Sequence, residues 1–251
     1  MRCVCLRDLI IPNVINVPNT NVDCTQKPNL ANVDISSVSG AVGNLCNARL
    51  GDVKLSCSSI SNSGLNGSNI GNLDVGDRCV TIGSQALSGS TVTDMRTGRN
   101  VSTIGDSACS ECRKLKSLTF DSITGISFGD FAFRNCYNLR EIHFGKLTAA
   151  INNTFQGDTA ITTVTFPPKS LKVAVRLSDT QYLTEQSCLN IVNAIADSAD
   201  VRISLSSNIK ALMTSEWYCK LNADSYITCT AEDDGAITQA EALLARGGTL
   251  A

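Results

Sequence analysis

A triplet of apolar residues, in the order apolar-x-x-apolar-x-apolar, recurs along the first two thirds of the sequence. Eight copies follow one another at steps of 20 to 24 residues, and their first positions are Leu6, Leu30, Leu50, Ile70, Val92, Leu115, Leu139 and Ile161. The fifth copy departs from the pattern, because Thr97 stands where a third apolar residue is expected. A repeat of this length is typical of a solenoid, in which each repeat is one coil that packs on its neighbours.

Each triplet predicts a short strand. Its last two apolar residues are two positions apart, so their side chains point to the same side, and the intervening residue points to the other. Stacking one such strand per coil gives a parallel sheet with about 4.8 Å between strands. The stretches between triplets are rich in Gly, Asn and Ser, which suit tight turns. The sequence therefore predicts an α/β-type solenoid, with one short strand in every coil of 20–24 residues.

The chain is expected to divide into a solenoid over residues 1–176 and a small C-terminal α/β capping domain over 177–251. Pro167 and Pro168 follow the last triplet, and proline cannot donate to a strand ladder. Beyond them the period is lost. The sequence there predicts a helix over 184–196 with Thr184 as its N-cap, strands over 201–205 and 226–229, and further helices over 209–221 and 237–245. Such a unit would cover the open end of the solenoid.

The outward-facing positions of the strands form two columns of mostly polar side chains. We name their candidate binding residues the outer strip, which comprises Asp8, Asn32, Asp34, Asp52, Asn72, Asp74, Asp94, Glu141 and His143. One interpretation is that these are solvated side chains that hydrogen-bond to neighbouring strands. The other is an acidic, amide-rich docking surface for a cationic partner, a polar surface or Ca²⁺. Stacked like charges repel, and the alternation of Asp with Asn reduces that repulsion under either interpretation.

Composition limits the class of function. The formal net charge is −2, so there is no basic excess that would bind a nucleic acid. No run of about 18 apolar residues is present, so we expect no insertion into a membrane. Arg7 and Asp8 interrupt any apolar segment at the start, so we expect no secretory signal peptide. A place on the outside of a cell would then need another route, and release in a phage particle is one.

The third quarter of the sequence carries a more specific pattern. Residues 126–144, which include Ala132-Phe133, Cys136, Leu139 and Ile142-x-Phe144, resemble the BspA-like leucine-rich repeat. Residues 104–115 are similar to the same unit, with Cys109 in place of the phenylalanine. The tail, over residues 183–196, 201–205 and 248–251, resembles a terminal unit of gut-bacterial and phage or prophage repeat proteins.

This resemblance implies a non-enzymatic protein with no cofactor, because the family motif contains no catalytic residue. Known members act as adhesins or surface-recognition proteins. We therefore expect a recognition or adhesion module that binds protein or glycan through its repeat surface. The alternative is a structural or receptor-binding component of a phage virion, in the tail or a head appendage. We also expect the first coil to be covered by a partner chain, a second copy or upstream sequence, because an open strand edge is adhesive.

Two features suggest chemistry, and both are better explained by structure. Cys109-x-x-Cys112 has the spacing of a redox or zinc motif, but both positions fall on inward-facing sites of the repeat, and no second pair stands at a suitable spacing for zinc. The sequence therefore predicts buried thiols and no metal site. His143 is the one histidine of the chain, and its place between Ile142 and Phe144 predicts an exposed residue on the sheet.

Overall fold

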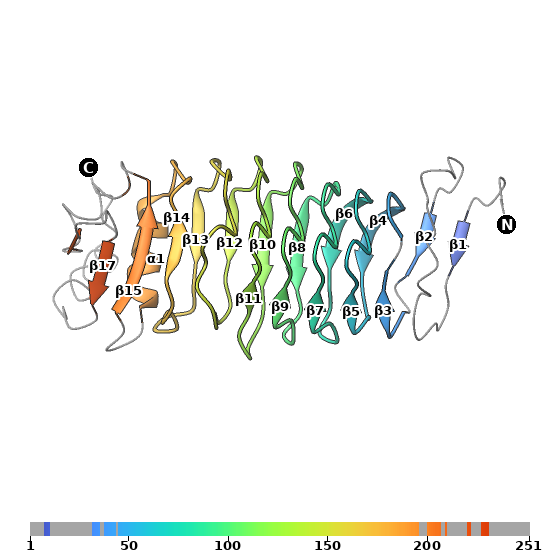
Figure 1. The fold of residues 1–251 in the computed structure, drawn as a ribbon, viewed down its shortest axis with the longest axis horizontal. Helices are drawn as coiled ribbons and strands as arrows, with labels where there is room; N and C mark the ends of the chain where they lie inside the picture. Colours follow the sequence, from blue (N-terminus) through green and yellow to red (C-terminus); the bar gives the residue numbers. More distant parts are fainter. Residues whose placement is uncertain are drawn as a thin grey trace.

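The computed structural model describes residues 8–10, 32–35, 38–43, 45–195, 200–206, 209, 220–221 and 227–230. These residues form an elongated stack of coils, with the N-terminal strands at one end and the only helix longer than one turn in the described ranges near the other (Figure 1). No helix in the described part of the chain is long and apolar enough to span a bilayer.

A parallel sheet of six strands runs along the stack, as the triplets predict. Its strands are β4 (Arg49–Lys54), β6 (Asn69–Asp74), β8 (Asp94–Thr97), β10 (Ser117–Phe120), β12 (Glu141–His143) and β13 (Thr163–Thr165). Two earlier strands, β1 (Asp8–Ile10) and β2 (Asn32–Asp34), form a parallel pair of their own. Successive coils contribute successive strands, so sequence order and spatial order coincide.

A second parallel sheet of five strands is a feature that the triplets do not predict. Its strands are β3 (Ala41–Val42), β5 (Ser59–Ile60), β7 (Thr81–Ile82), β9 (Thr103–Ile104) and β11 (Ser127–Phe128). Each strand has two residues, of which one faces the core, so no alternation of apolar and polar residues marks it in the sequence. Every coil from β3 to β12 is thus held to its neighbours by backbone bonds on two sides.

The core lies between the two sheets and changes in character along the stack. Its N-terminal part is aliphatic, whereas six phenylalanine rings fill the part between β10 and β13. Phe144 stacks on Phe120 and on Phe166, with ring centroids 5.6 and 4.6 Å apart. Phe133 stacks on Phe155 at 5.4 Å. Equivalent residues of successive coils therefore form continuous rows of rings, which we name the aromatic block, and Phe128 packs edge-on between the rows.

The turns after the second sheet use left-handed backbone at two positions per coil. In the coil that follows β11 these are Phe131 (φ 59°) and Asn135 (φ 61°), and the next coil places Gly157 (φ 84°) at the second position. This shape turns the backbone amides along the stack, so that Phe133 N donates to Thr154 O at 2.9 Å. Glycine and asparagine tolerate such a φ at little cost, which accounts for the Gly- and Asn-rich turns.

A column of polar side chains, the inner polar column, runs through the core beside these turns. Its members are Ser68, Ser90, Cys112, Cys136 and Asp158, and each is buried. Cys112 and Cys136 donate from Sγ to backbone carbonyls of the preceding coil, at 3.2 and 3.3 Å. Asp158 Oδ1 accepts from Cys136 N at 2.6 Å, while its Oδ2 has no hydrogen-bond partner. Burial raises the pKa of Asp158 to about 9, so this carboxyl is neutral at pH 7.

Helix α1 (Glu185–Ala194) covers the last strand of the six-stranded sheet. Thr184 is its N-cap, as predicted, and Thr184 Oγ1 accepts from Ser187 N at 3.2 Å. Ser187 Oγ also donates to Thr162 O at 2.9 Å and accepts from Val164 N at 3.0 Å. The Ser187 hydroxyl thus satisfies the Val164 N–H, and together with Thr184 N it satisfies Thr162 O, which is one way to close an exposed strand edge.

Replacing Ser187 with alanine is expected to lower the free energy of unfolding by roughly 1–3 kcal/mol, because the change leaves the buried N–H of Val164 unpaired. Urea titration followed by circular dichroism measures this loss. Gln186→Ala is the matched control, because Gln186 lies on the exposed side of the same helix turn. Equal losses in the two variants would show that the Ser187 hydroxyl does not stabilise the edge.

The last strands that the structure describes form a mixed sheet in the order β14-β15-β17-β16. Its strands are β14 (Val175–Leu177), β15 (Asp200–Leu205), β16 (Lys220–Leu221) and β17 (Ile227–Thr230). The predicted strands over 201–205 and 226–229 are present with small shifts. The prediction of a helix is wrong for Lys220 and Leu221, which pair with β17. Most of that helix, and the helix over 237–245, lie outside the described residues, and the division of the chain at residue 176 stays a prediction.

Candidate functional site

The outward positions of the six-stranded sheet come together as the repeat predicts. Asn72 pairs with Asp94, and the same column continues through Ser117 to Glu141. In the neighbouring column Asp74 lies beside Arg96. The same column then continues from Arg96 through Thr119 to His143. In the separate pair of strands, Asp8 lies opposite Asn32, and Asp34 lies opposite Ile10. Residues of the outer strip that belong to the same sheet therefore lie on adjacent strands, in register.

In the first column, which contains Asp52, Asn72 and Asp94, side chains form hydrogen bonds between neighbouring coils near a bulge in β4. The register of β4 against β6 shifts around Gly51, and this irregularity places Asp52 beside the backbone of the next coil. Asp52 Oδ1 accepts from Asn72 N at 2.7 Å. In turn Asn72 Oδ1 accepts from Thr93 Oγ1 at 3.2 Å. Asp94 is exposed and makes no such bond among the described residues.

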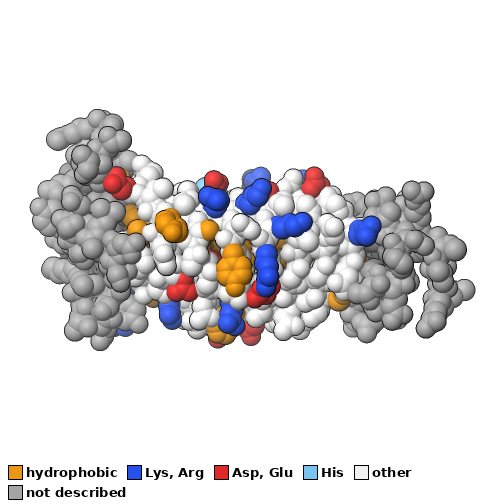
Figure 2. Space-filling view, turned by 90° about the horizontal axis from the view of Figure 1, so that it is seen from above, with side chains coloured by type: hydrophobic (Ala, Val, Ile, Leu, Met, Phe, Trp, Pro, Cys, Tyr) orange, Lys and Arg blue, Asp and Glu red, His pale blue; other side chains and the backbone are white. Residues whose placement is uncertain are grey.

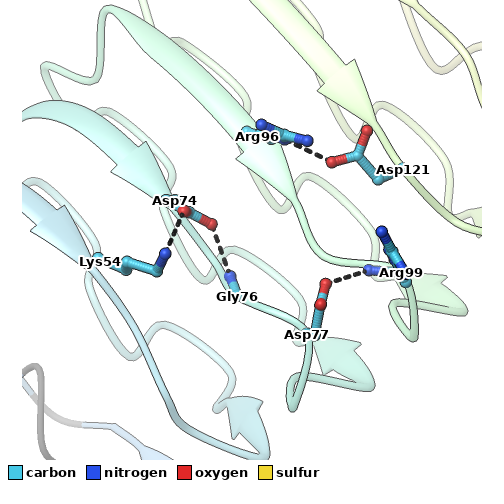
Figure 3. A network of polar contacts seen from close by, with 7 residues as sticks. All are labelled: Lys54, Asp74, Gly76, Asp77, Arg96, Arg99 and Asp121. Atoms are coloured by element: carbon cyan, nitrogen blue, oxygen red, sulfur yellow. Dashed lines mark hydrogen bonds and ion pairs between the residues drawn. The ribbon is translucent and has the colours of Figure 1, made fainter.

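The second column is neutralised by bases that alternate with its acids (Figure 3). Lys54 Nζ lies 3.4 Å from Asp74 Oδ2, and Asp74 Oδ1 accepts from Gly76 N at 3.0 Å. One coil further on, Arg96 forms an ion pair with Asp121. These pairs are exposed, so each stabilises the fold by less than about 1 kcal/mol. Their effect on the surface charge is local, because Lys54 offsets the charge of Asp74 and Arg96 that of Asp121, which lies outside the outer strip.

His143 lies at the C-terminal part of the same face. Its Nδ1 is 2.9 Å from Thr165 Oγ1, and its Nε2 is 3.8 Å from Glu141 Oε2. Each of these contacts joins side chains of the exposed sheet surface. His143 and Glu141 therefore belong to the polar lining of this surface, and the described residues do not place a serine or cysteine nucleophile beside them.

Seven cysteines have side chains that the structure describes; all seven are unpaired, and six of them are buried. Both members of Cys109-x-x-Cys112 have no exposed surface, as predicted. Burial raises the pKa of the Cys109 thiol, which opposes formation of a reactive thiolate. No three His, Cys, Asp or Glu side chains in the described ranges converge as metal ligands. Cys3, Cys5 and Cys24 lie outside the described residues.

The ion pairs of the second column are what the sequence reasoning missed. Asp34, Asp74 and His143 were selected as acidic or polar residues without the bases between them. The signal was present in the sequence, since Lys54 and Arg96 stand at the same repeat position as Asp74. Comparing whole columns, rather than selecting acids from them, would have predicted alternating charge.

Comparison with known proteins agrees with this geometry. Residues 56–177 match the BspA type leucine rich repeat region, in six copies. This span begins just after β4 and ends with β14, and it includes the aromatic block and the inner polar column. Neither the curated proteins nor the solved structures gave a match to the chain. Residues 56–177 are thus similar to BspA-type leucine-rich repeats, in agreement with the period and the stacked sheets.

Proposed function

We propose that this chain is a non-enzymatic recognition and adhesion module that binds a protein or glycan through the outer face of its six-stranded sheet. BspA-type repeats suggest a protein-binding or adhesion module, and solenoids of this class are typically non-catalytic. The observation that carries the proposal is the parallel register of six strands, which presents columns of polar side chains at a fixed spacing of about 4.8 Å. A face built from stacked coils is held in shape before a partner arrives, so little ordering entropy is lost on binding.

A double variant, Asp52→Lys with Asp94→Lys, tests this face. We expect the fold to be kept, because both side chains are exposed. We expect binding to weaken by about tenfold if the partner surface is cationic, because two attractive contacts become repulsive. The wild-type chain is first applied to protein and glycan arrays, and the variant is then compared on the ligands found, by biolayer interferometry.

The matched control is Asp106→Lys with Asp130→Lys, in the turns after the second sheet. Asp106 Oδ1 accepts from Asp130 N at 2.9 Å, so this pair loses the same kind of bond and the same charge. Equal loss in both double variants would show that net charge, and not the outer strip, governs binding. Unchanged binding by the Asp52/Asp94 variant would remove these two residues from the binding site.

The alternative, a structural or receptor-binding part of a phage particle, stays a prediction from the resemblance of the C-terminal segment. A partner or a second copy over the first coil also stays a prediction. Light scattering of the purified chain tests the latter, since a stable monomer would contradict coverage by a second copy.

A further inference from the structure

The turns that lead into the six-stranded sheet form a second surface of different chemistry. Figure 2 looks onto these turns and shows basic side chains gathered over the middle coils, with exposed apolar side chains among them. We name this surface the basic rim. Its residues are Arg113, Lys114, Lys116, Arg134, Tyr137 and Arg140, and all six are exposed.

The basic rim is confined to two neighbouring coils. Backbone bonds identify the equivalent positions, since Arg140 N donates to Lys116 O, and Lys116 N donates to Thr93 O. The coil before has Ser88, Thr91 and Thr93 at these positions, and the coil after has Gln156, Thr159 and Thr162. None of these six is charged. Two coils at about 4.8 Å each give the patch a width of about 10 Å.

The positive charge of the rim is local to it. The rim has five bases, and the acids next to them in the sequence are Glu111 and Glu141, while the whole chain has a formal net charge of −2. Glu111 is already engaged, because Asn135 Nδ2 donates to its Oε1 at 2.6 Å and Arg113 Nη2 lies 2.9 Å from its Oε2. The bond from Asn135, and then that from Arg113, lowers the pKa of Glu111. The remaining four bases have no carboxylate partner among the described residues.

The aromatic rings of this surface hold two of the guanidinium groups. Arg113 Cζ lies 5.9 Å from the centre of the Tyr137 ring, and Arg134 Cζ lies 5.3 Å from that of Phe131. Asn138 Nδ2 donates to Arg113 O at 2.6 Å, which fixes the backbone between the two coils. A guanidinium held against a ring loses less freedom on binding. Nε and Nη2 of Arg113 are engaged by Glu111, so only its remaining N–H groups face a partner.

We propose that the basic rim binds an acidic segment of a protein partner through the carboxylates of that segment. The planar fork of arginine matches a carboxylate with two parallel hydrogen bonds. Arginine and tyrosine are also the residues that dominate the energetics of protein–protein interfaces. A nucleic acid or a long sulfated glycan carries charge along its whole length and favours an extended basic track, whereas this patch ends after two coils. The inference rests on the proposed function, because it names the partner chemistry of a recognition module.

A peptide of ten glutamate residues with a fluorescent label is the probe, and anisotropy with the full chain is the measurement. We expect binding that weakens between about 50 and 300 mM salt, because exposed charges are screened over about 10 Å or less. The variant Arg113→Glu/Lys116→Glu/Arg140→Glu is expected to bind at least roughly tenfold more weakly, since attraction becomes repulsion. Tyr137→Ala keeps every charge and is expected to weaken binding severalfold through loss of the ring that supports Arg113.

The matched control reverses three exposed bases outside the rim, Arg78, Lys146 and Lys172, and changes the net charge equally. It is expected to stay within about threefold of the wild type. An equal loss in this control, or no binding of the peptide at millimolar concentration, would overturn the proposal. It would also be overturned if a single-stranded oligonucleotide or a heparin fragment of matched charge displaced the peptide at a lower concentration than unlabelled peptide does. Circular dichroism of each variant excludes unfolding as the cause.

These outcomes are independent of the test of the outer strip. The Asp52/Asp94 variant leaves the basic rim intact, and the rim variant leaves Asp52 and Asp94 in place. If the arrays find ligands whose binding depends on neither surface, the two proposals fail together. If only the rim variant binds these ligands like the wild type, the rim proposal fails and the recognition function stands.

Discussion

Replacing Phe133 with alanine is expected to lower the free energy of unfolding by about 3–5 kcal/mol, which is the cost typical of removing a buried phenylalanine ring. Phe133 has no exposed surface, and it stacks on Phe155 while meeting Phe120 and Phe128 edge-on. The ring therefore joins both rows of the aromatic block. Because a coil contacts only its neighbours, we expect the loss to be concentrated in the coils around β10 to β13.

Urea titration gives the size of this loss, and hydrogen exchange locates it. Amides of β12 should exchange much faster in the variant, while those of β4 and β6 should change little. Phe131→Ala is the control, since Phe131 lies two residues away, is only partly buried, and contacts Arg134 instead of the block. A loss below about 1 kcal/mol in Phe133→Ala would contradict the central role assigned to the aromatic block.

The stability of the chain is expected to fall as the pH rises from about 4 to about 9, because of Asp158. An aspartate in an unfolded chain has a pKa of about 3.9, whereas burial raises the pKa of Asp158 to about 9 in the fold. Between these values the folded state holds a proton that the unfolded state has released. The contribution of this group is therefore fully present below pH 4 and is lost as the pH rises toward 9, at up to about 1.4 kcal/mol per pH unit.

Asp158→Asn removes this titration and keeps an oxygen for the bond from Cys136 N. We expect the variant to exceed the wild type in stability at pH 8.5 and to show a smaller slope between pH 5 and 8.5. The same substitution at the exposed Asp130 is the control, and its slope should match the wild type. Free energies of unfolding at four pH values decide the matter, and identical slopes for all three proteins would show that Asp158 is ionised in the fold.

The strands of the main sheet were predictable because their signal is periodic. Leu118, Ile142 and Val164 lie in one row of the sheet, as the triplets require, and each is buried. Burial of one face fixes the register of a strand, since a slip of one residue would expose the whole apolar set. The replacement of an apolar residue by Thr97 did not break the pattern, and this side chain is buried although its Oγ1 has no hydrogen-bond partner.

Features that depend on contacts between coils were harder to predict. The strand Thr103–Ile104 is too short to show a period, and it forms because equivalent residues on both sides offer it backbone bonds. The basic rim was missed for a related reason. Arg113 and Arg140 occupy turns, where no apolar period aligns one coil with the next, and the net charge of the whole chain hides them. Aligning the turns by the buried Cys112 and Cys136 would have brought these bases together.

The α1 helix shows how the same approach succeeds at the end of the stack. Thr184 was predicted as an N-cap from its position before an apolar pattern, and the bond from Ser187 N confirms it. Ser187 stands where a capping box would have glutamate or glutamine. The structure explains the serine, because its hydroxyl hydrogen-bonds to the backbone at the edge of β13. The helix itself is capped by Thr184.

The bonds that join the coils also decide how this molecule would respond to a pulling force. The backbone bonds of both sheets, and those of the turns such as Leu87 N to Ala108 O, join one coil to the next and therefore run along the stack. Tension between the two ends would act on the coils in series, so that they detach one after another instead of resisting together. Each detached coil of about 22 residues would release up to roughly 75 Å of chain in place of the 4.8 Å that it occupies in the stack. Such a module would lengthen under load while its remaining coils kept their surface.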